Sequence, residues 1–311
     1  MATDSQKGIY FIQFPHPQTE TTPKRGGSTV EWNCNAPQRK FLVANGDYMD
    51  KKDIVKNQPL TFWGEWSPMS KVVRKFPSPK PYPKYLQEPQ LIMSDPACQC
   101  SSRQNTDPFV FSDGFRYCGC KQRQRRKTGE VLNLMALLEP GSIILFGSNF
   151  NTGKADAYFG VDTVFVVGSY REIGSFSGKD IVGIAQDSFF PPHFDIIMNP
   201  QLRSVSSNQK IEPNCWGPRF YIGATPDNPI EGMYSFVPCK NYDEKTKQGF
   251  ERPRITQEDI ANLAKISNGV RNFQHTQTDL ETNKKIWDNI RKHFAKQGFL
   301  EGVRFDYTLL P

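Results

Sequence analysis

The chain has 311 residues, which is long enough for one large domain or two ordinary ones with a substantial core. No apolar run approaches the ~20 residues that a membrane-spanning helix needs, and 23 Phe, 11 Tyr and 5 Trp exclude a fully disordered chain. A net charge of +7 favours a polyanionic partner over an acidic one. The first residues lack an apolar signal core, so we expect a cytoplasmic protein with free thiols and no membrane partner.

Short strands between Pro- and Gly-rich turns dominate the first two thirds of the chain. Asn45-Gly46 predicts a hairpin turn, because both residues tolerate positive φ. Five prolines between Phe76 and Pro89 predict a long extended loop. Apolar, β-branched and aromatic runs predict strands at residues 8–14, 40–44, 60–66, 142–146, 161–167, 220–222 and 234–237.

Helical periodicity appears in the last quarter of the chain. Residues 256–259, Thr-Gln-Glu-Asp, resemble a capping box and predict the start of a helix. A second helix is predicted over residues 281–297, because Ile286, Ile290 and Phe294 recur every four residues before a glycine.

Four of the seven cysteines form two close pairs, Cys98 with Cys100 and Cys118 with Cys120. Paired thiolates bind zinc, but structural zinc sites normally place at least two residues between paired cysteines. A single intervening residue favours ordinary loop and strand cysteines, so we expect no bound metal.

Familiar enzyme signatures are missing from the sequence. It contains no phosphate-binding P-loop, dinucleotide-binding Gly-x-Gly-x-x-Gly, nucleophile elbow or His-Glu-x-x-His. His16 lies between two prolines at the end of the first predicted strand. The flanking prolines fix its backbone, which suits either a rigid site residue or a structural turn.

Residues 61–66, Thr-Phe-Trp-Gly-Glu-Trp, carry the first candidate for catalysis. On a strand, Trp63 and Glu65 share one face. A carboxylate beside an indole loses hydration, which raises its pKa and suits a general acid or base. The alternative is a half-buried strand whose glutamate reaches solvent.

Residues 105–117 combine the amide of Asn105 with two carboxylates and four aromatic side chains. Asp107 precedes a proline, so its backbone is restrained as a catalytic carboxylate requires. The segment that follows, residues 121–127, is the densest positive run of the chain. Cations hold phosphates while aromatic rings stack on an unstacked base, so we expect DNA-backbone contacts from Lys121, Arg123, Arg125, Arg126 and Lys127.

Several motifs, in this order, resemble a group of poorly characterised bacterial proteins linked to nucleotide modification and phage defence. The motifs span residues 8–168 and read Tyr-Phe-Ile-Gln-Phe-Pro-His-Pro, Thr-Phe-Trp-Gly-Glu-Trp, Asn-Thr-Asp-Pro-Phe-Val-Phe, Leu-Glu-Pro-Gly-Ser-Ile-Ile-Leu-Phe-Gly-Ser and Val-Asp-Thr-Val-Phe-Val-Val-Gly. Residues 138–168 also resemble the core of PUA/ASCH/EVE-type β-barrels, with Ser142 where an aspartate is common. Such barrels bind RNA or modified, flipped-out bases.

This resemblance implies an α+β chain with a β-rich PUA/ASCH-like barrel core, long Pro-rich loops and a C-terminal helical segment. We expect the core domain and its base-binding pocket over residues 1–250. We expect the helical segment, packed on the core, over residues 251–311.

By context rather than by motif, the chain is also similar to antiviral DNA glycosylases. That likeness implies an enzyme that removes a modified, extruded base from foreign DNA by N-glycosidic hydrolysis without a cofactor. The expected catalytic carboxylate is Asp107, with Glu65 as the second candidate. A non-catalytic reader of modified bases or RNA, and an enzyme acting on free nucleotides, stay open as alternatives. The residues expected around the base are His16, Trp63, Asn105, Phe109, Phe111, Tyr117 and Gln122.

Overall fold

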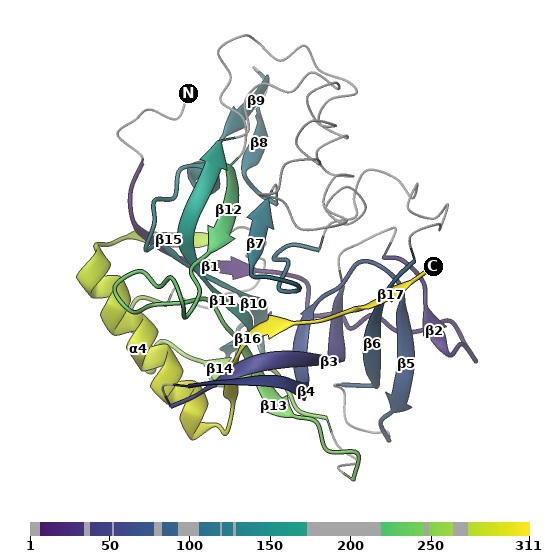
Figure 1. Ribbon diagram of the computed structural model, residues 1–311. Coiled ribbons are helices and arrows are strands. Elements are labelled where there is room, and N and C mark those ends of the chain that lie inside the picture. Colours follow the sequence, from purple (N-terminus) through teal and green to yellow (C-terminus); the bar gives the residue numbers. More distant parts are fainter. Residues whose placement is uncertain are drawn as a thin grey trace.

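The computed structural model describes residues 7–33, 38–51, 53–77, 83–92, 106–118, 120–126, 129–172, 219–245, 249–263 and 273–311. Within these ranges the chain is rich in strands and has one α-helix, α4 (Leu280–Lys296) (Figure 1). The expectation of a β-dominated α+β chain is therefore confirmed.

A seven-stranded sheet contains the longest apolar strands. In spatial order it consists of β15 (Gln274–Gln277), β1 (Tyr10–Pro15), β10 (Ile143–Phe150), β11 (Tyr158–Glu172), β12 (Arg219–Gly223) and β7 (Arg116–Cys118), with β14 (Arg254–Ile255) paired to β11. Strands β1 and β10 are parallel, and the other neighbours are antiparallel. The strands predicted at residues 8–14, 142–146, 161–167 and 220–222 all lie in this sheet, within a few residues of the expected bounds.

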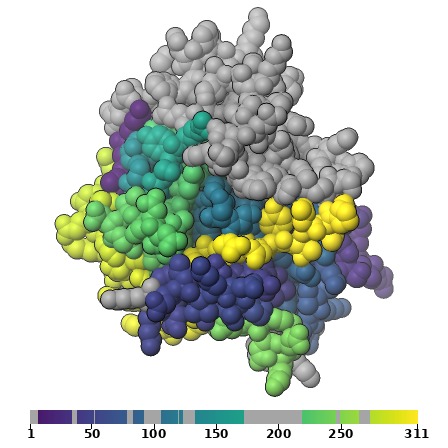
Figure 2. Space-filling model, viewed as in Figure 1, coloured from purple at the N-terminus to yellow at the C-terminus, as the bar shows by residue number. Residues whose placement is uncertain are grey.

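The second sheet has eight strands and combines the β3–β4 hairpin with strands from the C-terminal part of the chain. Its strands are β16 (Leu300–Phe305), β13 (Val237–Asn241), β4 (Asp53–Glu65), β3 (Arg39–Asp50), β6 (Tyr85–Ile92), β5 (Ser70–Lys75) and β2 (Thr29–Val30), with β17 (Thr308–Leu310) paired to β6. Figure 2 shows the C-terminal residues, in yellow, lying across the β3–β4 hairpin, in dark blue. Two further strands, β8 (Arg123–Arg126) and β9 (Gly129–Leu132), form a ribbon that belongs to neither sheet.

The prediction of a hairpin turn at Asn45-Gly46 is wrong. Strand β3 continues through both residues, and the chain reverses between Asp50 and Asp53. A Cβ atom on Gly46 would lie 2.3 Å from the backbone oxygen of Arg304 in β16. The glycine is therefore required by the close approach of a strand from the other end of the sequence, not by a local turn.

The proline-rich loop predicted up to Pro89 ends earlier than expected. Strand β6 begins at Tyr85 and contains Pro89, which lies opposite Ser70 of β5. Proline lacks the N–H that a ladder needs, but one missing donor is tolerated where the neighbouring residues keep their pairing.

Apolar side chains form layers on both sides of the seven-stranded sheet. Alternate residues such as Ile12 and Phe146 face the second sheet and pack with Leu42 and Phe62 of that sheet. The other face of β10 and β11 packs against α4, which buries Ile286, Trp287, Ile290 and Phe294. The helix predicted over residues 281–297 is confirmed, together with its buried face.

Residues 256–259 form the predicted capping interaction, but the helix predicted to start there is absent from the described residues that follow. The Thr256 hydroxyl donates to the Asp259 carboxylate at 2.8 Å. The described residues that follow, up to Leu263, form turns and not a helix, while Ile260 and Leu263 are buried against the α4 layer. Residues 251–311 also supply β14, β15, β16 and β17, so this segment contributes strands to both sheets.

Candidate functional site

Two residues predicted from sequence, His16 and Glu65, both lie near Arg39, in a buried group of charged side chains where strands of the two sheets approach each other. We call His16, Arg39, Glu65, Asp162 and Arg252 the Arg39 cluster. His16 directly follows β1, Arg39 begins β3 and Glu65 ends β4. Asp162 lies in β11, and Arg252 lies in the segment before β14. The β3–β4 ladder places Arg39 directly opposite Glu65.

Ion pairs join the four charged members of the Arg39 cluster in a chain. Arg39 Nη1 donates to Glu65, and Arg39 Nε lies 2.8 Å from Asp162 Oδ2. Arg252 Nε donates to Asp162 Oδ1 at 2.6 Å. These four side chains are at most 3% exposed. Desolvation makes each charge dependent on its partners, so the loss of one member leaves an uncompensated charge.

Burial sets the protonation of two members of the Arg39 cluster. It raises the pKa of Glu65 from 4.5 to about 7, although the Arg39 guanidinium acts in the opposite direction. Burial also lowers the pKa of His16 well below its usual range, and the positive charges of Arg39, Arg252 and Lys121 add to that effect. Near neutral pH the cluster therefore holds a neutral imidazole and a carboxyl group close to its midpoint of ionisation.

Some polar atoms of the Arg39 cluster have no hydrogen-bond partner in the described part of the chain. Both ring nitrogens of His16 are buried without a hydrogen-bond partner among the described residues. The Nη2 atoms of Arg39 and Arg252 are also buried without one. Buried donors and acceptors are almost always paired, so these unpaired atoms mark the cluster as a candidate site for a polar ligand. His16 is the most exposed member of the cluster; it is half-buried and is followed by the exposed residues 17–19.

Asp107 lies next to the Arg39 cluster but is occupied by backbone groups. Its two carboxylate oxygens each accept a hydrogen bond at 3.0 Å, one from the N–H of Cys118 and one from the N–H of Cys120. Its own N–H is hydrogen-bonded to the Glu65 carboxylate. This geometry is that of a carboxylate that holds the loop after β7 against the cluster, so we place Glu65 ahead of Asp107 as the acid–base group.

Four of the five predicted DNA-backbone residues lie in the loop and the β8–β9 ribbon that follow Cys120. Lys121 is exposed, has a positive φ of 61°, and contributes positive charge at His16. Arg123, Arg125 and Arg126 lie in β8. Lys127 and Asn105 are outside the described residues. The ribbon therefore begins directly after Cys120 and Lys121, whose side chains lie near members of the Arg39 cluster.

The aromatic residues expected around a base lie in apolar cores. Phe109, Phe111 and Tyr117 are at most 1% exposed and belong to the core between the sheets. Trp63 packs with Phe41 on the opposite face of β3 and β4. Gln122 is also buried and exchanges two hydrogen bonds with the backbone of Arg219, at 2.7 and 2.8 Å.

Three members of the Arg39 cluster were not predicted from sequence, namely Arg39, Asp162 and Arg252. Only Asp162 has a recognisable signal, because it is a carboxylate inside the otherwise apolar run of residues 158–167. Arg39 and Arg252 become significant only once the fold brings them to that carboxylate.

The cysteines and histidines of the described residues form no metal site. No group of three or more His, Cys, Asp or Glu side chains within the described ranges could hold a metal ion. Cys118 is buried and Cys120 half-buried, both as free thiols, whereas Cys98 and Cys100 lie outside the described residues.

No helix in the described ranges has the length and apolar character to cross a membrane. Comparison of the chain with protein-family models, with curated proteins and with solved structures finds no match.

Proposed function

We propose that this protein binds DNA through the β8–β9 ribbon and hydrolyses the N-glycosidic bond of a modified, extruded base at the Arg39 cluster. The observation that carries the proposal is the raised pKa of Glu65, about 7, in the same cluster as a His16 ring with two unpartnered buried nitrogens. An acid–base group is most effective when its pKa is close to the working pH. The PUA/ASCH-like identity of the strand core and a cytoplasmic location belong to the same proposal.

Three members of the Arg39 cluster, Glu65, His16 and Arg39, have roles in this reaction. The C1′–N bond breaks, the sugar develops positive charge, and the Glu65 carboxylate stabilises that charge and takes a proton from the attacking water. The water oxygen bonds to C1′, and the proton that Glu65 takes from the water passes to the leaving nitrogen of the base, so Glu65 ends as a carboxylate. The neutral His16 ring supplies a hydrogen-bond partner for the departing base. Arg39 holds Glu65 in position and is therefore a positioning residue.

The ribbon supplies the contact with DNA. A two-stranded β-ribbon fits the major groove, and arginines in such a ribbon neutralise phosphates. Because β8 follows directly after Lys121, whose charge acts on His16, we expect a duplex bound at the ribbon to have its extruded nucleotide near His16.

The test is to incubate the purified protein with unmodified and with hypermodified DNA and to cleave abasic sites with alkali. We expect strand breaks in the modified DNA alone. Glu65→Gln should reduce base release about 100-fold or more, while DNA affinity stays near that of the wild type. Glu88→Gln in β6, a carboxylate outside the cluster, is the control and should keep full activity.

A second variant tests the proposal in case Glu65→Gln loses activity because it does not fold. His16→Gln removes a ring that has no hydrogen-bond partner among the described residues, so we expect a folded protein with reduced base release. Tight binding of modified DNA with no abasic sites would favour the non-catalytic reader. Equal activity of Glu65→Gln and wild type would overturn the proposal.

A further inference from the structure

A pocket that the proposed function does not use lies on the outer face of the eight-stranded sheet. It has a volume of about 190 Å³ and is built from β3, β4, β5, β6 and β13 with the segment after β13. Sites for drug-sized ligands have roughly 300–1,000 Å³. The pocket therefore has room for a single ring system, and the rest of a larger ligand would lie outside it.

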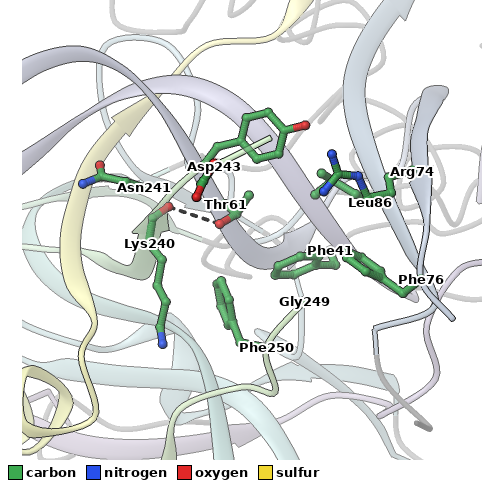
Figure 3. Close-up of a pocket in the computed structure, with 11 residues that line it drawn as sticks. Phe41, Thr61, Arg74, Phe76, Leu86, Lys240, Asn241, Asp243, Gly249 and Phe250 are labelled. Carbon is green, nitrogen blue, oxygen red and sulfur yellow. Dashed lines mark hydrogen bonds between the residues drawn. The ribbon is translucent and has the colours of Figure 1, made fainter. Parts of the chain in front are cut away.

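Aromatic rings form the walls of this pocket. Phe41 and Phe250 meet edge to face, with ring centroids 4.7 Å apart, and Phe76 lies 5.9 Å from Phe41. Figure 3 shows these three rings around the space. Trp63 supports them from beneath, because its Nε1–H donates to the backbone oxygen of Phe250 at 2.7 Å. Such walls favour a flat aromatic ligand.

Two cations lie on opposite sides of the pocket. In Figure 3, Lys240 extends on one side and Arg74 on the other. The Lys240 ammonium lies between two rings, 5.3 Å from the Phe250 ring centroid and 4.7 Å from that of Phe299. Arg74 Nη2 donates to the backbone oxygen of Glu244 at 2.7 Å, which holds the guanidinium at the rim. Two positive charges around an aromatic site favour a ligand that carries an anionic group.

Polar side chains complete the lining and distinguish among flat anions. Thr61, Asn241 and Asp243 line the same pocket. The Thr61 hydroxyl donates to the backbone oxygen of Lys240 at 3.1 Å, and Asp243 Oδ1 accepts from the N–H of Lys245 at 2.8 Å. The Asn241 amide, with its carbonyl and N–H₂ groups, suits a ring whose edge carries both donors and acceptors. A nucleobase has such an edge, whereas a simple phenyl ring does not.

We infer that this pocket binds one nucleotide, with its base against Phe41 and Phe250 and its phosphate at Lys240 or Arg74. A free nucleotide and a nucleotide within a single strand share this chemistry. The inference does not rest on the proposed function. Trp63 lies between the pocket and the Arg39 cluster, since Phe41 is paired with Trp63 and Arg39 with Glu65 on the same ladder.

The experiment is calorimetric titration of the full chain with the nucleoside 5′-monophosphates of all four bases. The comparison ligands are the matching nucleosides, inorganic phosphate, phenyl phosphate and a short single-stranded oligonucleotide. We expect at least one monophosphate to bind more than about 10-fold tighter than its nucleoside, inorganic phosphate or phenyl phosphate. Tighter binding of the oligonucleotide than of every monophosphate would assign the pocket to a strand, and the reverse would assign it to a free nucleotide.

Variants localise the binding. Phe250→Ala should weaken nucleotide binding about 10-fold or more, and Lys240→Gln should weaken the nucleotide but not the nucleoside. Lys71→Gln, an exposed lysine of β5 outside the pocket, is the control and should have no effect. Glu65→Gln should also leave this binding unchanged, which separates the pocket from the proposed catalysis. Unaltered affinity in Phe250→Ala, or phenyl phosphate binding as tightly as the nucleotides, overturns the inference.

Discussion

The guanidinium of Arg252 lies over the indole of Trp63, 4.4 Å from the ring centroid. The same arginine is paired with Asp162, and the same indole supports the backbone of Phe250 in the aromatic pocket. One face of the β3–β4 hairpin thus carries two chemically different regions, a buried ionic one around Arg39 and an aromatic one around Phe41. Trp63 and Arg252 form the boundary between them.

The position of Asp107 predicts a structural effect of its substitution. Asp107→Asn keeps one acceptor but turns an amide N–H₂ group toward a backbone N–H of the loop after β7. We expect the free energy of unfolding to fall by about 1–3 kcal/mol, which urea denaturation measures. An Asp107→Asn protein with wild-type stability and no base release would instead make Asp107 the catalytic carboxylate.

The raised pKa of Glu65 predicts a pH dependence of stability. Between pH 4.5 and about 7 the folded state holds a proton on Glu65 that the unfolded state has released. Stability therefore decreases as pH rises through this window, by up to about 3 kcal/mol for this group. Subtracting the Glu65→Gln stability curve from that of the wild type should isolate this slope. Parallel curves for the two proteins would show that Glu65 titrates at its ordinary pKa.

The β8–β9 ribbon predicts the salt dependence of DNA binding. Replacing Arg123, Arg125 and Arg126 by Ala should lower the slope of log K against log salt by about 0.9 for each phosphate that the variant no longer neutralises. The triple variant Lys154→Ala, Lys292→Ala, Lys296→Ala removes the same charge from exposed sites elsewhere and serves as the control. Equal slopes for the two triple variants would show that the ribbon makes no specific contribution.

Two glycines of the β3–β4 hairpin test the packing of β16 on β3. A Cβ atom at position 46 would meet the backbone oxygen of Arg304 at 2.3 Å, so Gly46→Ala should destabilise the protein by about 3 kcal/mol or more. At Gly64 the nearest atom is 3.3 Å away, on the Phe62 ring, and Gly64→Ala should destabilise the protein by only about 1 kcal/mol. Thermal unfolding of both variants measures the difference. A similar destabilisation of both would contradict the strand pairing described here.

Local patterns in the sequence determine the helix α4 and the apolar strands of the seven-stranded sheet. The four-residue repeat of Ile286, Ile290 and Phe294 predicts the buried face of α4 because a helix places such residues on one side wherever it packs. The alternation of Trp63 and Glu65 likewise predicts their shared face, since side chains on a strand alternate with period two.

Only the tertiary structure decided where the charges meet and what each glycine is for. Arg39, Asp162 and Arg252 are far apart in the chain, and nothing local indicates that they pair. Asn45-Gly46 carries a strong turn signal, yet Gly46 serves the approach of Arg304 from β16. Long-range pairing overrides a local preference of about 1 kcal/mol, because each buried strand contact and ion pair depends on partners that only the folded chain brings together.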